Sequence, residues 1–175
     1  MRTGASTKMA VAIVVLAGLL AMPTRGGDKS ASKPAPGKGF PDLVGALKAT
    51  PGCLGVETAK TDSGKQVIFA WFEDKKAALK WYYSDTHRQV MKQFFPGRDN
   101  DTPLKNVPAD SGPILAIASI TFADKPHFKA TPLPISQIAI ELYQPVSGGV
   151  FLGGRFAPGS LKVPGMRDAT PKEKK

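Results

Sequence analysis

The chain has 175 residues, a single cysteine and a formal net charge of +10 from 24 basic and 14 acidic residues. One cysteine excludes an intrachain disulfide, so a hydrophobic core must hold the fold together. The basic residues are scattered rather than gathered between aromatic residues, which argues against a nucleic-acid-binding protein and favours a solvated basic surface.

Residues 1–27 have the pattern of an export signal. Arg2 and Lys8 flank the start of an uncharged apolar run over residues 9–22, and small residues follow it. This run is shorter than the roughly 20 residues that a membrane-spanning helix needs. A cleaved signal peptide is therefore favoured over an uncleaved membrane anchor. We expect an exported protein, periplasmic or secreted, without stable membrane insertion after cleavage.

Composition divides the remaining chain into three parts. Residues 28–39 are rich in Gly, Pro, Ser and Lys, which predicts a flexible linker. Residues 40–160 have the length and apolar content of a single domain. Residues 161–175 form a basic tail that we expect to be disordered.

The first predicted elements are a helix and a hairpin. A short helix over residues 43–49 ends at Thr50-Pro51-Gly52. Strands over residues 53–60 and 66–73 are joined by a turn at Asp62-Ser63-Gly64, because the glycine tolerates positive φ. The second strand is apolar on both faces, which predicts that both faces are covered.

A broken helix is predicted next. Asp74 has the place of an N-cap, and the apolar stripe changes face near Ser84. We therefore expect Ser84 to cap a second short helix that holds His87 and Met91.

The second half of the chain predicts a long loop and more strands. Residues 96–113 contain four prolines and predict a surface loop without regular structure. Strands are expected over residues 114–123 and 135–143, and residues 150–156 are expected to return as a hairpin partner. The alternation within residues 135–143 predicts one inward-facing row, formed by Ile138, Ile140 and Leu142.

The densest aromatic region contains the candidate site. His87 is the candidate catalytic residue, because a neutral imidazole beside aromatic walls can move a proton. Side chains of the same region are the candidate ligand-binding residues, namely Phe69, Trp71, Trp81, Tyr83 and Met91. The alternatives are that these rings fill the core and that His87 is a helix-edge residue satisfied by a carbonyl.

Metal and thiol chemistry are weakly supported. His87 and Met91 share a helix face, but two ligands do not make a metal site, so we expect no metal and no cofactor. Cys53 has no base near it in the sequence and is expected to be a buried, inert thiol.

Three stretches in residues 51–95 carry a family resemblance. PGCLGVE at 51–57, VIFAWFEDKKAALKWYYS at 67–84 and DTHRQVM at 85–91 resemble the antibiotic biosynthesis monooxygenase-like domain. The resemblance implies a ferredoxin-like α+β fold with helices on one face of an antiparallel sheet, a homodimeric α/β barrel, and a cleft that holds His87 and Trp81. The residues before the first helix are not strand-like. The family's usual first strand is therefore missing or replaced by a C-terminal strand.

The expected function follows from this resemblance. It implies an exported protein that binds a small aromatic molecule. If the protein is an enzyme, it would be a cofactor-independent monooxygenase acting on aromatic or quinol substrates. The alternative is a non-catalytic envelope protein that uses the fold for dimerisation or partner binding.

Overall fold

The computed structural model describes residues 42–97 and 102–172, and all of them belong to the same structural unit. The predicted signal peptide and linker lie outside these residues. Within the described ranges, no helix is long and apolar enough to cross a membrane.

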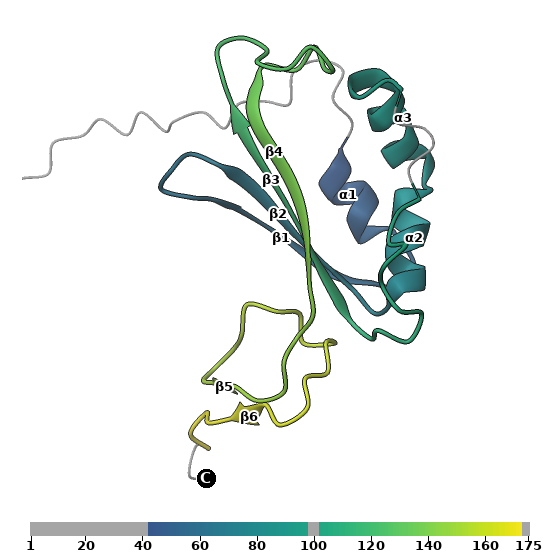
Figure 1. Ribbon diagram of the computed structural model, residues 1–175. Coiled ribbons are helices and arrows are strands. Elements are labelled where there is room, and N and C mark those ends of the chain that lie inside the picture. Colours follow the sequence, from purple (N-terminus) through teal and green to yellow (C-terminus); the bar gives the residue numbers. More distant parts are fainter. Residues whose placement is uncertain (1–41, 98–101, 173–175) are drawn as a thin grey trace, which may run out of the picture. The chain divides into compact units, whose positions relative to one another are not determined.

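Four antiparallel strands form the main sheet (Figure 1). They are β1 (Cys53–Lys60), β2 (Gln66–Phe72), β3 (Ile114–Phe122) and β4 (Ile135–Tyr143). Their order in the sheet is β1-β2-β3-β4, so chain neighbours are also sheet neighbours. The turn between β1 and β2 has Gly64 at φ 83°, as the sequence predicts. This sheet and its helices confirm the predicted α+β class.

Three helices lie on one face of the sheet (Figure 1). They are α1 (Leu43–Lys48), α2 (Lys75–Tyr82) and α3 (Asp85–Phe94). The helix α1 packs on β1 and α2 packs on β2, whereas α3 packs on α1 and α2. The main helix–sheet contacts are therefore those with the β1–β2 half of the sheet.

Side-chain caps set the starts of the helices. The Asp74 carboxylate accepts a hydrogen bond of 2.7 Å from the Ala77 N–H, and the Ser84 hydroxyl accepts one of 3.2 Å from the His87 N–H. These bonds satisfy N–H groups that have no partner inside their helix. The predicted break at Ser84 is confirmed, because Ser84 lies between α2 and α3 with extended backbone.

The core lies between the helices and the β1–β2 half of the sheet. Strand residues of one pleat face pack against helix residues, and the buried set is Leu47, Val56, Ala70, Phe72, Ala77 and Ala78. Removing these apolar side chains from water is the main driving force for this packing. In the described part of residues 96–113 there are turns but no helix or strand, as predicted. The Lys75 ammonium ties this loop to α2 by donating a 2.7 Å hydrogen bond to the Val107 carbonyl.

The far half of the sheet differs from the prediction. One part of the prediction holds, since alternate residues of β4 share the side that faces the helices, namely Ile138, Ile140 and Leu142. Ile140 lies opposite Ala118 of β3, and Ala118 lies opposite Ile68 of β2, which packs against the core. They are not inward, however, since their exposed fractions are 37%, 65% and 42%. The side of β4 that faces the helices is therefore open to solvent at these three positions.

The C-terminal segment corrects two further predictions. It forms β5 (Val150–Phe151), which pairs in parallel with β6 (Arg167–Asp168) instead of making a hairpin with β4. Residues 161–172 are not a disordered tail, because Leu161 is buried and β6 lies within them. The composition predicts a disordered tail because glycine, proline and lysine are frequent here. A small number of apolar residues, Leu161 among them, is nevertheless enough to hold the segment in place.

The same segment covers the outer face of the sheet beside β1 and β2. The Phe156 ring lies edge-on to the Trp71 ring, with centroids 5.1 Å apart, and Trp71 is buried. Pro158 lies over Gly55, where a side chain would collide with its ring carbons. The Ser160 hydroxyl donates a 3.4 Å hydrogen bond to the Leu54 carbonyl. The chain's C-terminal part thus caps the β1 end of the sheet.

Candidate functional site

The junction of α2 and α3 gathers an aromatic cluster around His87. The cap by Ser84 makes the chain turn at this point, so the first turn of α3 faces the last turn of α2. The His87 ring centroid lies 5.5 Å from that of Trp81 and 4.7 Å from that of Tyr82. Trp81 in turn packs against the core. The predicted neighbourhood of His87 and Trp81 is therefore present.

The environment of His87 favours its neutral form. Its Nδ1 atom is buried and makes no hydrogen bond. Burial lowers the pKa of His87 below the ordinary 6.5, and the backbone of Tyr82 opposes that shift only in part. A neutral imidazole can accept a proton, which is the property that a general base needs.

Two other predicted site residues lie near this cluster. Tyr83 is half-exposed, and its ring packs edge-on against Tyr82 with centroids 5.2 Å apart. The Arg88 guanidinium lies over the Tyr83 ring, 5.6 Å from its centroid, in a cation–π contact. Met91 follows His87 by one turn of α3 and is half-buried.

Phe69 and Trp71 lie elsewhere. Their side chains point to the outer face of the sheet, because they alternate with Ala70 and Phe72 of the core. There the two rings stack with centroids 6.2 Å apart, and Phe156 covers both. The structure thus places the two tryptophans on opposite faces of the sheet, and the single aromatic hollow expected from the sequence divides into two separate clusters.

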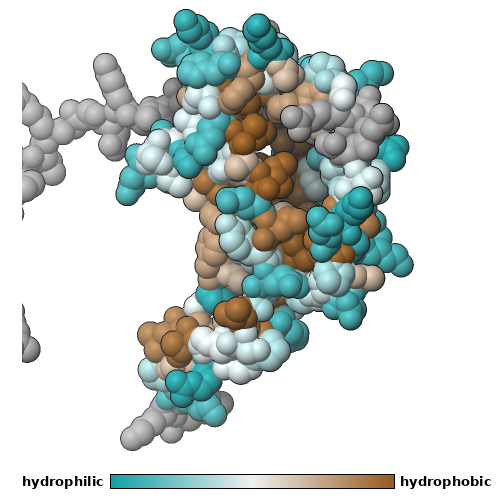
Figure 2. Space-filling model, in the orientation of Figure 1, coloured by the Kyte–Doolittle hydropathy of each residue, from teal (hydrophilic) through white to brown (hydrophobic). Residues whose placement is uncertain are grey.

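The exposed face of β4 is a feature that the sequence pattern did not identify as a surface. We call Ile138, Ile140 and Leu142 the aliphatic strip. Their partners on β3 are Ile120, Ala118 and Ala116, all half-buried, and Ala116 packs against the core. Figure 2 shows apolar side chains gathered along a hollowed part of this face. The strip is therefore a solvent-exposed extension of the apolar surface that forms the core.

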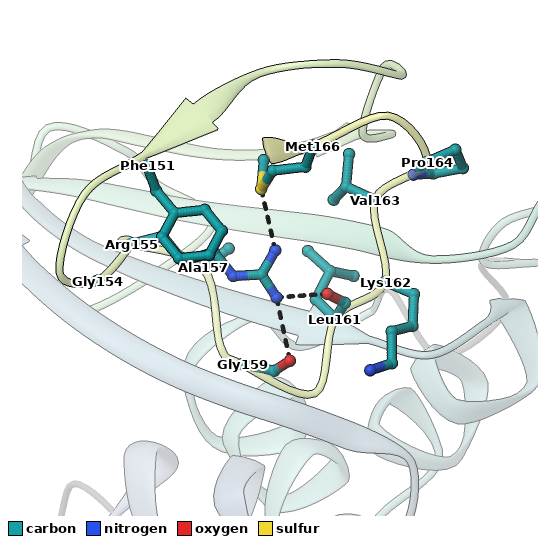
Figure 3. A pocket seen from close by; sticks show the side chains of 10 residues that line it. All are labelled: Phe151, Gly154, Arg155, Ala157, Gly159, Leu161, Lys162, Val163, Pro164 and Met166. Carbon is teal, nitrogen blue, oxygen red and sulfur yellow. Dashed lines mark hydrogen bonds between the residues drawn. The ribbon is translucent and has the colours of Figure 1, made fainter. Parts of the chain in front are cut away.

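A cavity of about 590 Å³ lies within the C-terminal segment (Figure 3). Arg155 points into it, but its guanidinium donates hydrogen bonds to the Pro158, Gly159 and Leu161 carbonyls and contacts the Met166 sulfur at 3.2 Å. Donors used in this way are not free for an anion. Arg155 therefore organises the loop around it.

Metal and thiol chemistry find little support in the described residues. No group of three His, Cys, Asp or Glu side chains there is placed to hold a metal ion. Burial raises the pKa of the Cys53 thiol, against a weaker opposing effect of its hydrogen bond to the Gly55 carbonyl. A raised pKa disfavours the thiolate, which is the reactive form.

No family model, curated protein or solved structure matches this chain. Its function must therefore be argued from the geometry of the His87 cluster and the aliphatic strip.

Proposed function

We propose that the protein binds a small aromatic or otherwise apolar molecule against the helix-facing side of β3 and β4. The observation that carries this proposal is the aliphatic strip. Contiguous exposed apolar side chains are costly to leave in water, and on soluble proteins they commonly mark a binding site. The strip lies beside the helical layer, so a ligand there would be bordered by a sheet and by helices.

Ligand titration tests this proposal directly. A panel of hydroquinones, naphthoquinones and simple phenols would be titrated by calorimetry, with tryptophan fluorescence as a second readout. We expect saturable binding by at least one member and a loss of affinity of at least about tenfold in Ile140→Asp, because a carboxylate in the strip would have to be desolvated. Val146→Asp is the matched control, since Val146 is exposed and lies outside the strip. Absence of binding across the panel, or equal affinity in the two variants, would contradict the proposal.

The second candidate is a cofactor-independent oxygenase, and the neutral imidazole of His87 beside Trp81 and Tyr82 favours it. In that reaction His87 would accept the proton of a phenolic hydroxyl, and dioxygen from solution would be the oxidant. Oxygen uptake with each ligand that binds would be measured for wild type and His87→Gln. Uptake that disappears in His87→Gln while binding persists supports catalysis, whereas binding without uptake supports a binding protein alone.

The strand order supports a distant relation to the antibiotic biosynthesis monooxygenase-like fold. In a ferredoxin-like sheet the first strand lies between the hairpin and the last strand. Here β3 has that middle place, antiparallel to both neighbours, and β4 has the far edge. We propose that strands after the helices replace the family's first strand. Dimerisation and export through residues 1–27 belong to the same proposal, and N-terminal sequencing of secreted protein would test the latter.

A further inference from the structure

We propose that the outer edge of β4 pairs with β4 of a second copy of this chain. The two strands would run antiparallel about a two-fold axis and join two four-stranded sheets into one. This surface is separate from the sheet faces, and the proposal does not depend on ligand binding.

Within the described residues, the outer edge of β4 is unpaired and lacks the usual protections. Its sheet neighbour is β3 alone. Over residues 137–143 it contains no proline, no glycine and no bulge, and its one charged residue is Glu141. Soluble proteins generally protect an edge strand with charges, prolines, bulges or a covering segment, because unpaired backbone groups bind another strand.

The opposite edge shows these protections. The pairing of β1 with β2 has an irregularity between Cys53 and Gly55, and β1 carries Glu57 and Lys60. The C-terminal segment reaches it through the hydrogen bond from Ser160 to the Leu54 carbonyl. A second copy would therefore pair with β4 and not with β1.

Charge and hydrogen bonding favour an axis at Ile140 over an axis at either neighbouring residue. A two-fold axis at Glu141 would place two carboxylates opposite each other, which is unfavourable in a cross-strand pair. An axis at Ala139 would require Ile135 to pair with the second copy. The Ile135 side chain is buried, and its carbonyl already accepts a 3.3 Å hydrogen bond from the His127 N–H. An axis at Ile140 avoids both problems.

This register continues the aliphatic strip across the interface. Ile140 lies opposite its own copy and Ile138 lies opposite Leu142, on the helix-facing side. On the outer side, Glu141 lies opposite Ala139. The partner's strip would thus extend the apolar surface, and both copies would border one longer binding face.

Substitutions at Ala139 test the pairing without touching the strip, because Ala139 pairs with Ser119 on the outer side of the sheet. The dimer dissociation constant would be measured by sedimentation velocity without ligand. Ala139→Glu places a carboxylate opposite Glu141 twice, so we expect the constant to rise about tenfold. Ala139→Lys should lower it, and Ala139→Glu combined with Glu141→Lys should restore it.

Ala59→Glu and Ala59→Lys are the matched controls. Ala59 is an exposed alanine on the outer side of the other edge strand, where it pairs with Val67. These variants should dimerise like wild type. A wild-type protein that stays monomeric, equal weakening by both charges at Ala139, or no response at Ala139 would each overturn the proposed pairing, and none of them bears on ligand binding.

Discussion

The two halves of the sheet have similar strands and different surroundings. The half formed by β1 and β2 has helices on one face and the C-terminal segment on the other, so Phe72 is 1% exposed and Trp71 is 3% exposed. The half that ends in β4 has an equally apolar pattern, yet Ile140 is 65% exposed. Hydrophobic side chains therefore stabilise the monomer only where another element reaches them. Elsewhere they remain available for a ligand or a partner.

The largest expected effect compares one residue from each half. Phe72→Ala should lower the free energy of unfolding by about 3–5 kcal/mol, because it opens a cavity in the closed core. Ile140→Ala should lower it by less than about 1 kcal/mol, because that side chain is already in water. Urea denaturation of dilute protein would measure both. Similar losses in the two variants would mean that the halves are equally packed in solution.

A smaller effect is expected where the C-terminal segment meets β1. A β-carbon at Gly55 would lie 2.9 Å from Cγ of Pro158, a ring that cannot turn away. Gly55→Ala should therefore cost about 1–3 kcal/mol and loosen the segment. Faster proteolysis after residue 156, with unchanged cleavage elsewhere, would be the specific sign. Ala59→Gly is a control on the same strand that introduces no collision.

The pH dependence of stability tests the helical layer. His87 has a lowered pKa in the folded protein, so the unfolded chain binds a proton first as the pH falls below 6.5. The contribution of neutral His87 is thus complete above that pH and is lost as the pH falls toward the lowered folded pKa. Chemical denaturation at a series of pH values should show a weaker loss in His87→Gln. His127→Gln, which changes the other histidine, is the matched control.

The smallest expected effect is on thiol reactivity, compared between residue 53 and residue 140. The half-buried Cys53 should react slowly with a disulfide reagent, because burial raises its pKa. In a Cys53→Ser background, Ile140→Cys should react faster, at a rate near that of an unstructured thiol, with little change in stability. A slow reaction at residue 140 in dilute monomer would show that the strip is covered.

Local features were predictable from the sequence, because they depend on neighbouring residues. Asp74 and Ser84 were identified as caps, and the bounds of β4 were correct, because capping and alternation act over a few positions. Alternation shows which side chains share a face, but not whether another element covers that face. For this reason Ile138, Ile140 and Leu142 were assigned to the core and instead form a surface.

The candidate site was predicted in part for the same reason. His87 and Trp81 are close in sequence and are joined by one cap, so their contact is a local consequence. The sequence groups Trp71 with them because a strand and the helix that follows it can bring several aromatic rings close together. The pleat of β2 directs Trp71 to the outer face of the sheet, away from Trp81. Phe156 covers Trp71 there, and no local sequence pattern predicts this contact because Phe156 lies far along the chain.

The bond between Ser160 and Leu54 joins residues that are 106 positions apart. During translation the N-terminal part of a chain emerges and begins to fold first. The meander can therefore assemble before Pro158 and Ser160 have left the ribosome, while β1 still has an uncovered side. A nascent or prematurely terminated chain would thus have two unprotected edge strands, β1 and β4, where the full chain has one.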